Sequence, residues 1–243
     1  MNRFMYRINK IIYRLTKNKR SNYYCYYYKN CKKYTGNKII IIDNNTEKEL
    51  PASTYFDNLN IRWEGSDNTV IIPAIDNIYN SEIVFNGNGN TISFGENPIG
   101  QFSLTCYENN SKMSFGKNID CRFVSVSIHN EDQFTMGDNC LVADLLFCTT
   151  DGHSVIDKET KKLLNVPPYN VKIGNNVWIC REVRLLKNAC IPNNCIVGMN
   201  SIVTKSFNEE NCVIAGNPAK IVKRNIEWSS CKPSEYKREG VML

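Results

Sequence analysis

Aliphatic residues recur at every sixth position in the second half of the chain. The series is Ile173, Ile179, Leu185, Ile191, Val197 and Val203. A second series lies four positions further along and is mostly small or apolar: Val177, Val183, Ala189, Cys195, Ser201 and Phe207. The positions between the two series hold mainly glycine, asparagine and charged residues, which suit turns and contact with water.

A period of six predicts neither a helix nor an ordinary strand pair. An amphipathic helix repeats its apolar face every three or four residues, and a half-buried strand alternates at every second residue. Short strands joined by tight corners fit the period, because each strand points its aliphatic side chains inward and the chain turns at Gly or Asn, which tolerate positive φ. Stacked turns of this kind bury one continuous core. The pattern therefore predicts an all-β fold, a parallel β-helix solenoid.

The same spacing is weaker upstream and is interrupted once at length. Ile72, Ile78 and Val84 are six apart, residues 115–119 lead into Cys121 and Ser127, and residues 136–140 lead into Val142 and Cys148. Residues 149–172 form a long loop excursion, and long loops on a rigid scaffold often carry function. We expect three segments: a basic, aromatic-rich N-terminal segment, helical or irregular, over residues 1–69; the β-helix domain over residues 70–207; and a helical C-terminal tail over residues 208–243.

Composition narrows the choice of partners only a little. The chain has 243 residues, 42% hydrophobic and 22% charged, which suits one globular domain. A net charge of +6 favours anionic partners without choosing among them. Eleven cysteines without a CxxC pair or zinc-finger spacing predict neither a disulfide framework nor a metal site, and we expect Cys121, Cys148 and Cys195 to pack as small apolar residues. The apolar runs fall short of the ~20 residues that a membrane span needs.

Four motifs in the last third of the chain carry a family resemblance. They are DGHSVID at residues 151–157, IGNNVWI at 173–179, VGMNSIVTKSF at 197–207 and VIAGNPAK at 213–220. In this order they resemble the hexapeptide-repeat acyltransferases, and they are most similar to the capsular polysaccharide O-acetyltransferases, including those that modify polysialic acid. Each motif alone is weak, whereas the set of four is specific.

The resemblance implies more than the period does. Spacing leaves the hand of the coil open, and parallel crossovers are right-handed in about 98% of cases, whereas the resemblance implies a left-handed coil. It also implies a homotrimer with acetyl-CoA bound in clefts between subunits. The implied reaction moves an acetyl group to a sugar hydroxyl of a bacterial surface polysaccharide, within a ternary complex and without a metal or a nucleic-acid partner.

Acyl transfer to an alcohol needs a general base, because the hydroxyl proton must leave as the bond forms. Neutral histidine suits this role near pH 7, and the chain has only His129 and His153. His153 lies in the excursion, inside the Asp-Gly-His motif, so we expect it to be the base, with Asp151 or Asp157 orienting its ring. His129 lies outside every motif, and we expect it to be structural.

The remaining candidates concern the oxyanion and the cofactor. Trp178 could donate its indole N–H to the oxyanion, since the matching tryptophan of the resembling enzymes lies near the acetyl group. Packing at the trimer seam is its other expected role, and both can hold. For the CoA phosphates we expect cations, and for the pantetheine arm small residues that permit close approach. The candidates are Lys205, Lys220, Lys223 and Arg224 for the phosphates, with Gly198, Ser201, Thr204, Ala215 and Trp178 along the rest of the cofactor.

Two questions stay open at this level. Residues 1–20 carry seven basic and no acidic residues, with apolar side chains at helical spacing. We expect a cytoplasmic protein, in which this segment could rest on the inner face of the cell membrane, lie beside an anionic glycan, dock on the trimer or be solvated. The acceptor could instead be small, such as a nucleotide-linked amino sugar, serine or an antibiotic. A non-catalytic β-helix binding module is the alternative outside enzymology.

Overall fold

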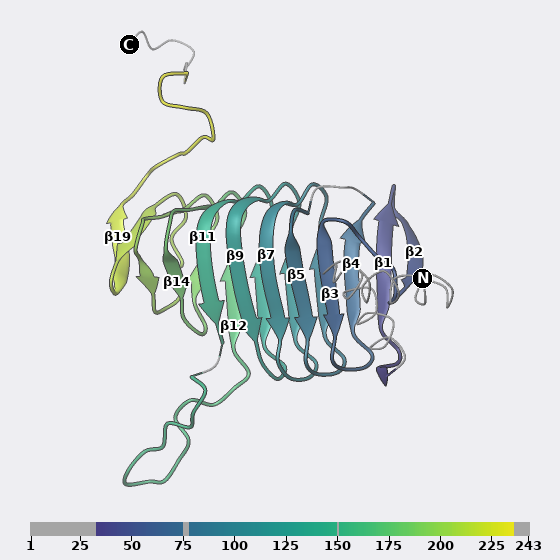
Figure 1. Ribbon diagram of the computed structural model, residues 1–243. Helices are drawn as coiled ribbons and strands as arrows, with labels where there is room; N and C mark the ends of the chain where they lie inside the picture. The colour runs from purple at the N-terminus through teal and green to yellow at the C-terminus, as the bar shows by residue number, and fades with distance from the viewer. Residues whose placement is uncertain (1–32, 75–77, 150, 236–243) are drawn as a thin grey trace, which may run out of the picture.

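The computed structural model describes residues 33–74, 78–149 and 151–235, which form a long prism of stacked strands (Figure 1). One sheet contains β1 (Lys38–Asp43), β2 (Thr46–Pro51), β4 (Thr69–Pro73), β6 (Thr91–Phe94), β8 (Lys112–Phe115), β10 (Gln133–Met136), β12 (Asn170–Ile173) and β15 (Cys190–Ile191). The other contains β3 (Leu59–Trp63), β5 (Ser81–Phe85), β7 (Ile99–Cys106), β9 (Asp120–Ile128), β11 (Leu141–Cys148), β13 (Trp178–Ile179), β16 (Ile196–Val197), β18 (Val213–Gly216) and β19 (Ala219–Lys223). From the last third of β11 onward a third face forms, with β14 (Val183–Leu185) and β17 (Ile202–Val203).

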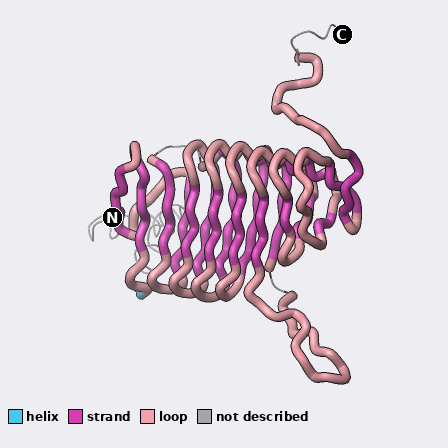
Figure 2. The backbone as a smooth tube through the Cα atoms, turned by 180° about the vertical axis from the view of Figure 1, so that it is seen from behind, coloured by secondary structure: helices cyan, strands magenta, loops and turns pink. Residues whose placement is uncertain are grey.

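The coil is parallel and left-handed. In Figure 1 the strands from β5 to β11 descend on the near face, those of the first sheet rise behind them, and the chain advances from right to left. Figure 2 shows the same stack from behind. The usual right-handed crossover is therefore absent. Asparagines make the sharp turns: Asn97, Asn118, Asn139, Asn176 and Asn194 all have φ between 53° and 57°, a region that Asn tolerates better than most residues.

Three edges of the prism are defined by these turns. Edge 1 joins the first sheet to the second and contains the positive-φ asparagines just named. Edge 2 joins β13 to β14 and β16 to β17. Edge 3 returns the chain to the first sheet, and the excursion between β11 and β12 leaves the prism there.

Turns of the coil differ in length along the prism. Met113 pairs with Phe134, 21 positions later, whereas Ile173 pairs with Ile191, 18 positions later. Eighteen is three hexapeptides, so the six-residue ladder is strict only after the excursion. Both predicted series from residue 173 onward are buried, as expected.

Upstream the predicted register is partly wrong. Val84 lies half-exposed while its neighbours Ile83 and Phe85 are buried, because a turn of 21 residues shifts every six-step count. Cys148 is likewise exposed, whereas Cys121 and Cys195 are buried as predicted.

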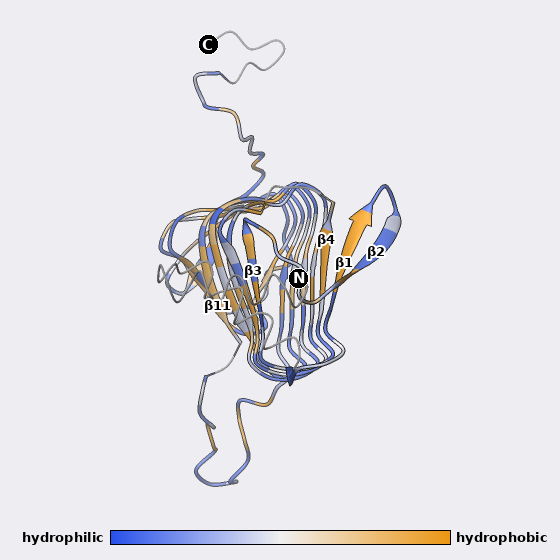
Figure 3. Ribbon diagram, turned by 45° about the vertical axis from the view of Figure 1, so that its right-hand side comes forward, coloured by the Kyte–Doolittle hydropathy of each residue, from blue (hydrophilic) through white to orange (hydrophobic). Residues whose placement is uncertain are grey.

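Strand hairpins close both ends of the described prism. The parallel ladder begins upstream of the expected boundary at residue 70, since β1 pairs with β4 and β3 with β5. The outer strand β2 is polar and pairs antiparallel with the apolar β1 (Figure 3), so the end of the sheet presents polar groups rather than an apolar edge.

The predicted helical tail is wrong. Residues 213–223 form the antiparallel pair β18–β19, and residues 224–235 continue without a helix. The VIAGNPAK motif at residues 213–220 forms β18 and its turn into β19, and the extended backbone of Val213 and Ile214 pairs with β16 instead of coiling. The predicted N-terminal helix, residues 1–20, lies outside the described residues. Among the residues that the structure describes, no helix is long and apolar enough to cross a membrane.

Candidate functional site

The excursion is a structured arm. Its two sides are joined by an antiparallel bridge between Ile156 and Leu163. At its tip the carboxylate of Asp157 accepts hydrogen bonds from the backbone N–H and the hydroxyl of Thr160, at 2.6 and 2.7 Å. These bonds hold the pKa of Asp157 below its ordinary value. Asp157 therefore closes the turn of the arm, a role different from the predicted orientation of His153.

His153 is held through its backbone by one side chain, that of Asn165. The amide nitrogen of Asn165 donates to the carbonyl oxygen of His153 at 2.8 Å and to Asp151 Oδ2 at 2.9 Å. Its amide oxygen accepts from the backbone N–H of Val155 at 2.8 Å. One amide group thus binds three positions centred on the histidine, whose side chain is exposed.

The base of the arm is tied to the next rung by an ion pair. Lys187, at edge 3 between β14 and β15, contacts the Asp151 carboxylate, and its ammonium also lies 5.2 Å from the centre of the Tyr169 ring. The hydrogen bond from Lys187, followed by that from Asn165, lowers the pKa of Asp151. Among the described residues, neither Asp151 nor Asp157 is hydrogen-bonded to the His153 imidazole, and the orientation of the ring by a carboxylate stays a prediction.

His129 lies in a different environment. Its ring stacks on Tyr107 with centroids 5.0 Å apart, and its backbone N–H donates to Thr149 Oγ1 at 3.1 Å. The contacts are those of a turn residue on edge 3.

Trp178 opens β13 beside edge 1. Its ring centroid lies 6.0 Å from that of Trp228, and the indole N–H of Trp228 donates to the carbonyl oxygen of Asn176 at 2.8 Å. Residues 226–233 thereby lie along edge 1. A cleft of about 900 Å³ opens between this C-terminal segment and the turns of edge 1.

The small residues predicted for the pantetheine arm meet at edge 2. A Cβ added to Gly198 would lie 2.9 Å from the Cβ of Ala215 on the next rung. The close approach of the two rungs therefore leaves no room for a larger residue at position 198. The buried Ser201 hydroxyl accepts from the backbone N–H of Gly216 at 3.1 Å. Thr204 is exposed after β17.

Three of the four predicted cations share one hollow at the C-terminal end of the prism. Lys205, Lys220 and Arg224 line it, in a volume of about 380 Å³. Arg224 also pairs with Glu209 at 2.8 Å. Lys223 lies on β19 and does not line this hollow.

The predicted site residues therefore lie on different edges of one chain. His153 extends from edge 3, Trp178 lies at edge 1, and Gly198 and Ser201 lie at edge 2. Sequence reasoning missed Asn165, Lys187 and Trp228. Asn165 and Trp228 are a polar residue and an aromatic residue outside the ladder, and no spacing distinguishes them from ordinary loop residues.

The fold and the arm together define a class. A left-handed parallel β-helix with strict hexapeptide turns, interrupted by one histidine-bearing excursion and ended by an Ala-Gly-Asn-Pro turn, is the arrangement of a hexapeptide-repeat acyltransferase. A scan against models of known protein families finds no match. Individual relatives, however, are clear.

The chain is 34% identical over 166 residues to polysialic acid O-acetyltransferase of Neisseria meningitidis, covering 68% of this chain and 76% of that one. It is 33% identical over 146 residues to the putative lipopolysaccharide biosynthesis O-acetyl transferase WbbJ of Escherichia coli strain K12, covering 56% and 74%. The chain belongs to the hexapeptide-repeat acetyltransferase family.

Solved structures agree on the fold. The crystal structure of the polySia-specific acetyltransferase NeuO superposes with a TM-score of 0.68 and 25% identity, covering 83% of this chain and 88% of that chain. Other relatives are matched over less of their length: the chain spans 33% of the polysialic acid O-acetyltransferase of Escherichia coli O1:K1 and 54% of the galactoside O-acetyltransferase of strain K12.

Proposed function

We propose that this protein transfers an acetyl group from acetyl-CoA to a hydroxyl group of a bacterial surface polysaccharide. The observation that carries the proposal is the histidine-bearing arm, clamped at its base onto the strict hexapeptide rungs of a family whose named relatives are O-acetyltransferases. Acetyl-CoA is made in the cytoplasm, so we place the reaction there.

His153 acts as the general base. Its imidazole accepts the proton of the acceptor hydroxyl as the oxygen attacks the thioester carbonyl. The proton then goes to the departing thiolate, so that CoA leaves as a thiol and His153 is neutral again. The indole N–H of Trp178 is our candidate donor to the oxyanion of the tetrahedral intermediate.

The residues present fit the co-substrate. Lys205, Lys220 and Arg224 gather positive charge in one hollow, as the phosphates of CoA require. The arrangement of Gly198 against Ala215 keeps edge 2 narrow, which suits a thin, neutral pantetheine chain. We assign Lys223 no contact in this scheme.

Two copies must contribute to each site if His153 and Trp178 serve one reaction, because the two residues lie on different edges of one chain. Three copies around a threefold axis let the arm of each reach the tryptophan edge of the next, with closed symmetry. We therefore propose a homotrimer with three equivalent sites. The exposed apolar residues of the arm, Val155, Ile156, Leu163, Leu164 and Val166, support such a contact.

Complementation between two inactive variants tests this arrangement. His153→Ala and Trp178→Ala each lose the bulk of acetyl transfer, about 100-fold or more for the base. Co-expression of the two with different affinity tags restores part of the activity in the mixed trimers, because some interfaces then pair an intact arm with an intact tryptophan. The control is co-expression of the wild type with the variant that carries both substitutions, which shows the activity of trimers that mix intact and inactive chains. Mixed oligomers without recovered activity would place both residues in one chain's site and refute the shared site.

The acceptor class has its own test. Release of CoA is measured with acetyl-CoA and a panel of polysaccharides, small sugars, serine and chloramphenicol. Turnover restricted to the small acceptors would replace the polysaccharide with the alternative function. A quarter of the chain does match a chloramphenicol acetyltransferase of Klebsiella aerogenes, which is why the drug belongs in the panel.

A further inference from the structure

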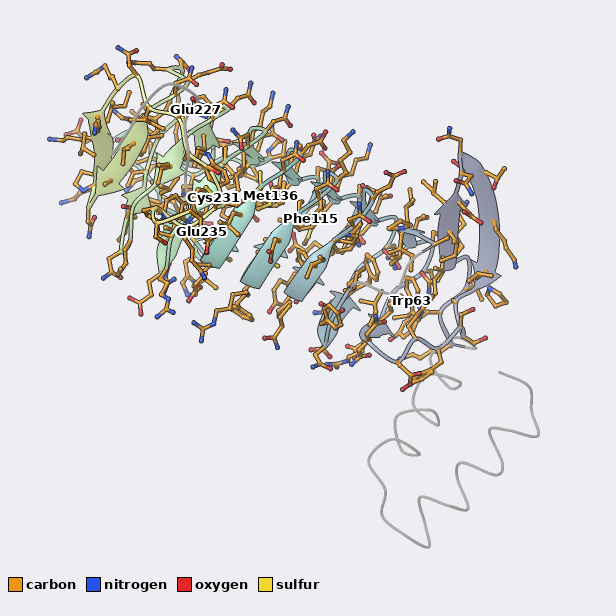
Figure 4. All side chains as sticks on the ribbon, turned by 90° about the horizontal axis from the view of Figure 1, so that it is seen from above. Trp63, Phe115, Met136, Glu227, Cys231 and Glu235 are labelled. Atoms are coloured by element: carbon orange, nitrogen blue, oxygen red, sulfur yellow. The ribbon has the colours of Figure 1, made fainter. Side chains whose placement is uncertain are left out.

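The cleft at edge 1 is separate from every residue predicted for the base and the phosphates. Turns of three successive rungs line one side of it and the C-terminal segment lines the other. Figure 4 labels Glu227 and Cys231 of that segment. The lining residues are Asn118, Asp120, Asn139, Cys140, Leu141 and Asn176 from the prism, with Glu227, Trp228, Ser229, Ser230, Cys231 and Pro233 from the segment.

The amide groups of the floor form a ladder that is broken inside the cleft. Asn97 donates to Asn118 at 2.9 Å and Asn118 to Asn139 at 3.0 Å, and further along Asn176 donates to Asn194 at 2.9 Å. Among the described residues no hydrogen bond joins Asn139 to Asn176, although the two occupy the same position on adjacent rungs. The break leaves an amide N–H donor on Asn139 and an amide oxygen acceptor on Asn176 within the lining.

Trp228 forms one end of the cleft. Its indole N–H is fixed to the Asn176 carbonyl oxygen, and its ring lies beside that of Trp178. A second hollow on the other side of Trp228 continues along edge 1 past Asn194 and Asn211. An aromatic face combined with planar amides and carboxylates is a surface suited to a sugar ring, which has one apolar face and a rim of hydroxyl groups.

The acidic residues of the cleft favour uncharged sugars over anionic ones. Asp120 and Glu227 line the cleft, and none of the described residues in its lining is Lys or Arg. The nearest basic residue of the segment, Lys232, pairs with Glu235 at 3.5 Å. Carboxylates accept hydrogen bonds from hydroxyl groups strongly, but they repel a second carboxylate.

We propose that this cleft binds one unit of the acceptor saccharide, and that this unit is uncharged. The proposal rests on the proposed acetyl transfer, because the cleft lies beside Trp178, where that function puts the reacting acetyl group. It separates this protein from its relatives named for polysialic acid, since a sialic acid carboxylate would face Asp120 and Glu227.

Binding is measured first without acetyl-CoA, so that the result does not depend on turnover. Saturation-transfer NMR is run with methyl galactoside, methyl N-acetylglucosaminide and a polysialic acid oligomer on the full chain. We expect saturation of the neutral sugars and none of the polysialic acid. Preferential binding of polysialic acid, or of no saccharide, would overturn the proposal, whereas failure of acetyl transfer with intact sugar binding would overturn only the proposed function.

Substitutions then locate the site. Glu227→Gln should weaken binding of the neutral sugar about tenfold, the effect of one charge-assisted hydrogen bond, and raise KM for the acceptor with KM for acetyl-CoA unchanged. Glu47→Gln, an exposed carboxylate on β2 at the other end of the prism, is the control and should have no effect. Trp228→Phe keeps an aromatic ring, so it should bind better than Trp228→Ala. A change confined to KM for acetyl-CoA would assign the cleft to the cofactor and refute the saccharide.

Discussion

The prism fills its core with different side chains before and after the excursion. Before the excursion, turns of 21 or 22 residues enclose stacked rings: Trp63 on Phe85 at 5.0 Å, Phe94 on Phe115 at 4.9 Å, and Phe115 against Phe134 at 5.4 Å. After it, turns of 17 or 18 residues enclose mainly aliphatic side chains, Ala and Cys, together with the ring of Phe207. A longer turn encloses a wider core, and protein interiors tolerate few voids, so the longer turns need rings and the shorter turns need Val, Ile and Cys. We call the part before the excursion, up to residue 148, the wide half and the part from residue 173 onward the narrow half.

The edges differ as well. In the first half, edge 3 buries a chain of polar side chains, in which the amide oxygen of Asn68 accepts from Asn90 and that of Asn90 accepts from the Ser111 backbone N–H. In the second half, the same edge holds the exposed Lys187 to Asp151 pair and the arm. The half after the excursion therefore carries the candidate base, cations and small residues, whereas the half before it contributes surface turns to the cleft at edge 1.

Removing a ring from the wide half has the largest expected effect on stability. Phe134→Ala should lower the free energy of unfolding by about 3–5 kcal/mol, because it leaves a cavity between Phe115 and Phe147. Ile191→Val in the narrow half should cost only about 1 kcal/mol. Chemical denaturation followed by circular dichroism measures both, and equal losses would show that the rings do not fill a wider core.

This difference also explains what the sequence could predict. From Ile173 to Val203, turns of three hexapeptides pair without a shift, so both series and the parallel coil were predictable. Upstream, the six-step count puts Val84 on the wrong face, because turns of 22 and 21 residues are not multiples of six. The hand of the coil came from family motifs rather than spacing.

The site was predictable only in part. The prediction for His153 comes from its motif, and its role stays a prediction. The side chain of Asn165, which bonds the His153 carbonyl oxygen, makes contacts that depend on how the arm folds back, and no local pattern encodes them. The same is true of Trp228, whose partner Asn176 is 52 positions away.

Loss of the Asn165 hydrogen bonds around His153 should have the next largest effect. Asn165→Ala should lower kcat about 10- to 100-fold, because a base displaced by about 1 Å loses much of its alignment, with KM for acetyl-CoA unchanged. Unfolding should be nearly unaffected, since the arm is exposed. Thr160→Ala, which loosens only the tip of the arm, is the control. Equal kcat in both variants would mean that Asn165 does not position the base.

The buried polar chain of the wide half should be sensitive to single deletions. Asn90→Ala leaves the buried Ser111 backbone N–H without its acceptor and the Glu108 carbonyl oxygen without the Asn90 amide, while the backbone N–H of residue 90 still donates to Asn68. The expected loss is about 1–3 kcal/mol in the free energy of unfolding. Asn194→Gly on the half-buried edge 1 keeps the positive φ and should cost less. Thermal unfolding of the two variants decides between them, and a larger loss for Asn194→Gly would reverse the ranking of the edges.

Lowering the pH from 8 to 5 should not weaken the ion pair between Lys187 and Asp151, which joins the arm to the prism. The folded-state pKa of Asp151 lies below its ordinary value of 3.8, so the pair with Lys187 contributes above that value and is lost only as the pH falls through the lower folded value. Limited proteolysis of the arm should therefore proceed at one rate from pH 8 to pH 5 in buffers that keep the protease equally active. Asp151→Asn should be cleaved faster at every pH in this range. Faster cleavage of the wild type at pH 5 would assign the arm's stability to another group.

The smallest expected effect is the difference in how fast buried cysteines react in the two halves of the prism. Burial raises the pKa of Cys121 in the wide half to about 12 and that of Cys140, near the boundary, to about 11. In the narrow half the pKa of Cys212 is raised to about 12, and Cys195 is fully buried beside it. Since the thiolate is the reactive form, iodoacetamide at pH 8 should first modify the exposed Cys148 and Cys231, and peptide mass spectrometry follows each site. Denaturant should make all of them react. Early modification of Cys195 or Cys212 while Cys121 stays protected would show that the narrow, aliphatic core opens more readily than the ring-filled one, and that the half with the candidate site is the less rigid part of the prism.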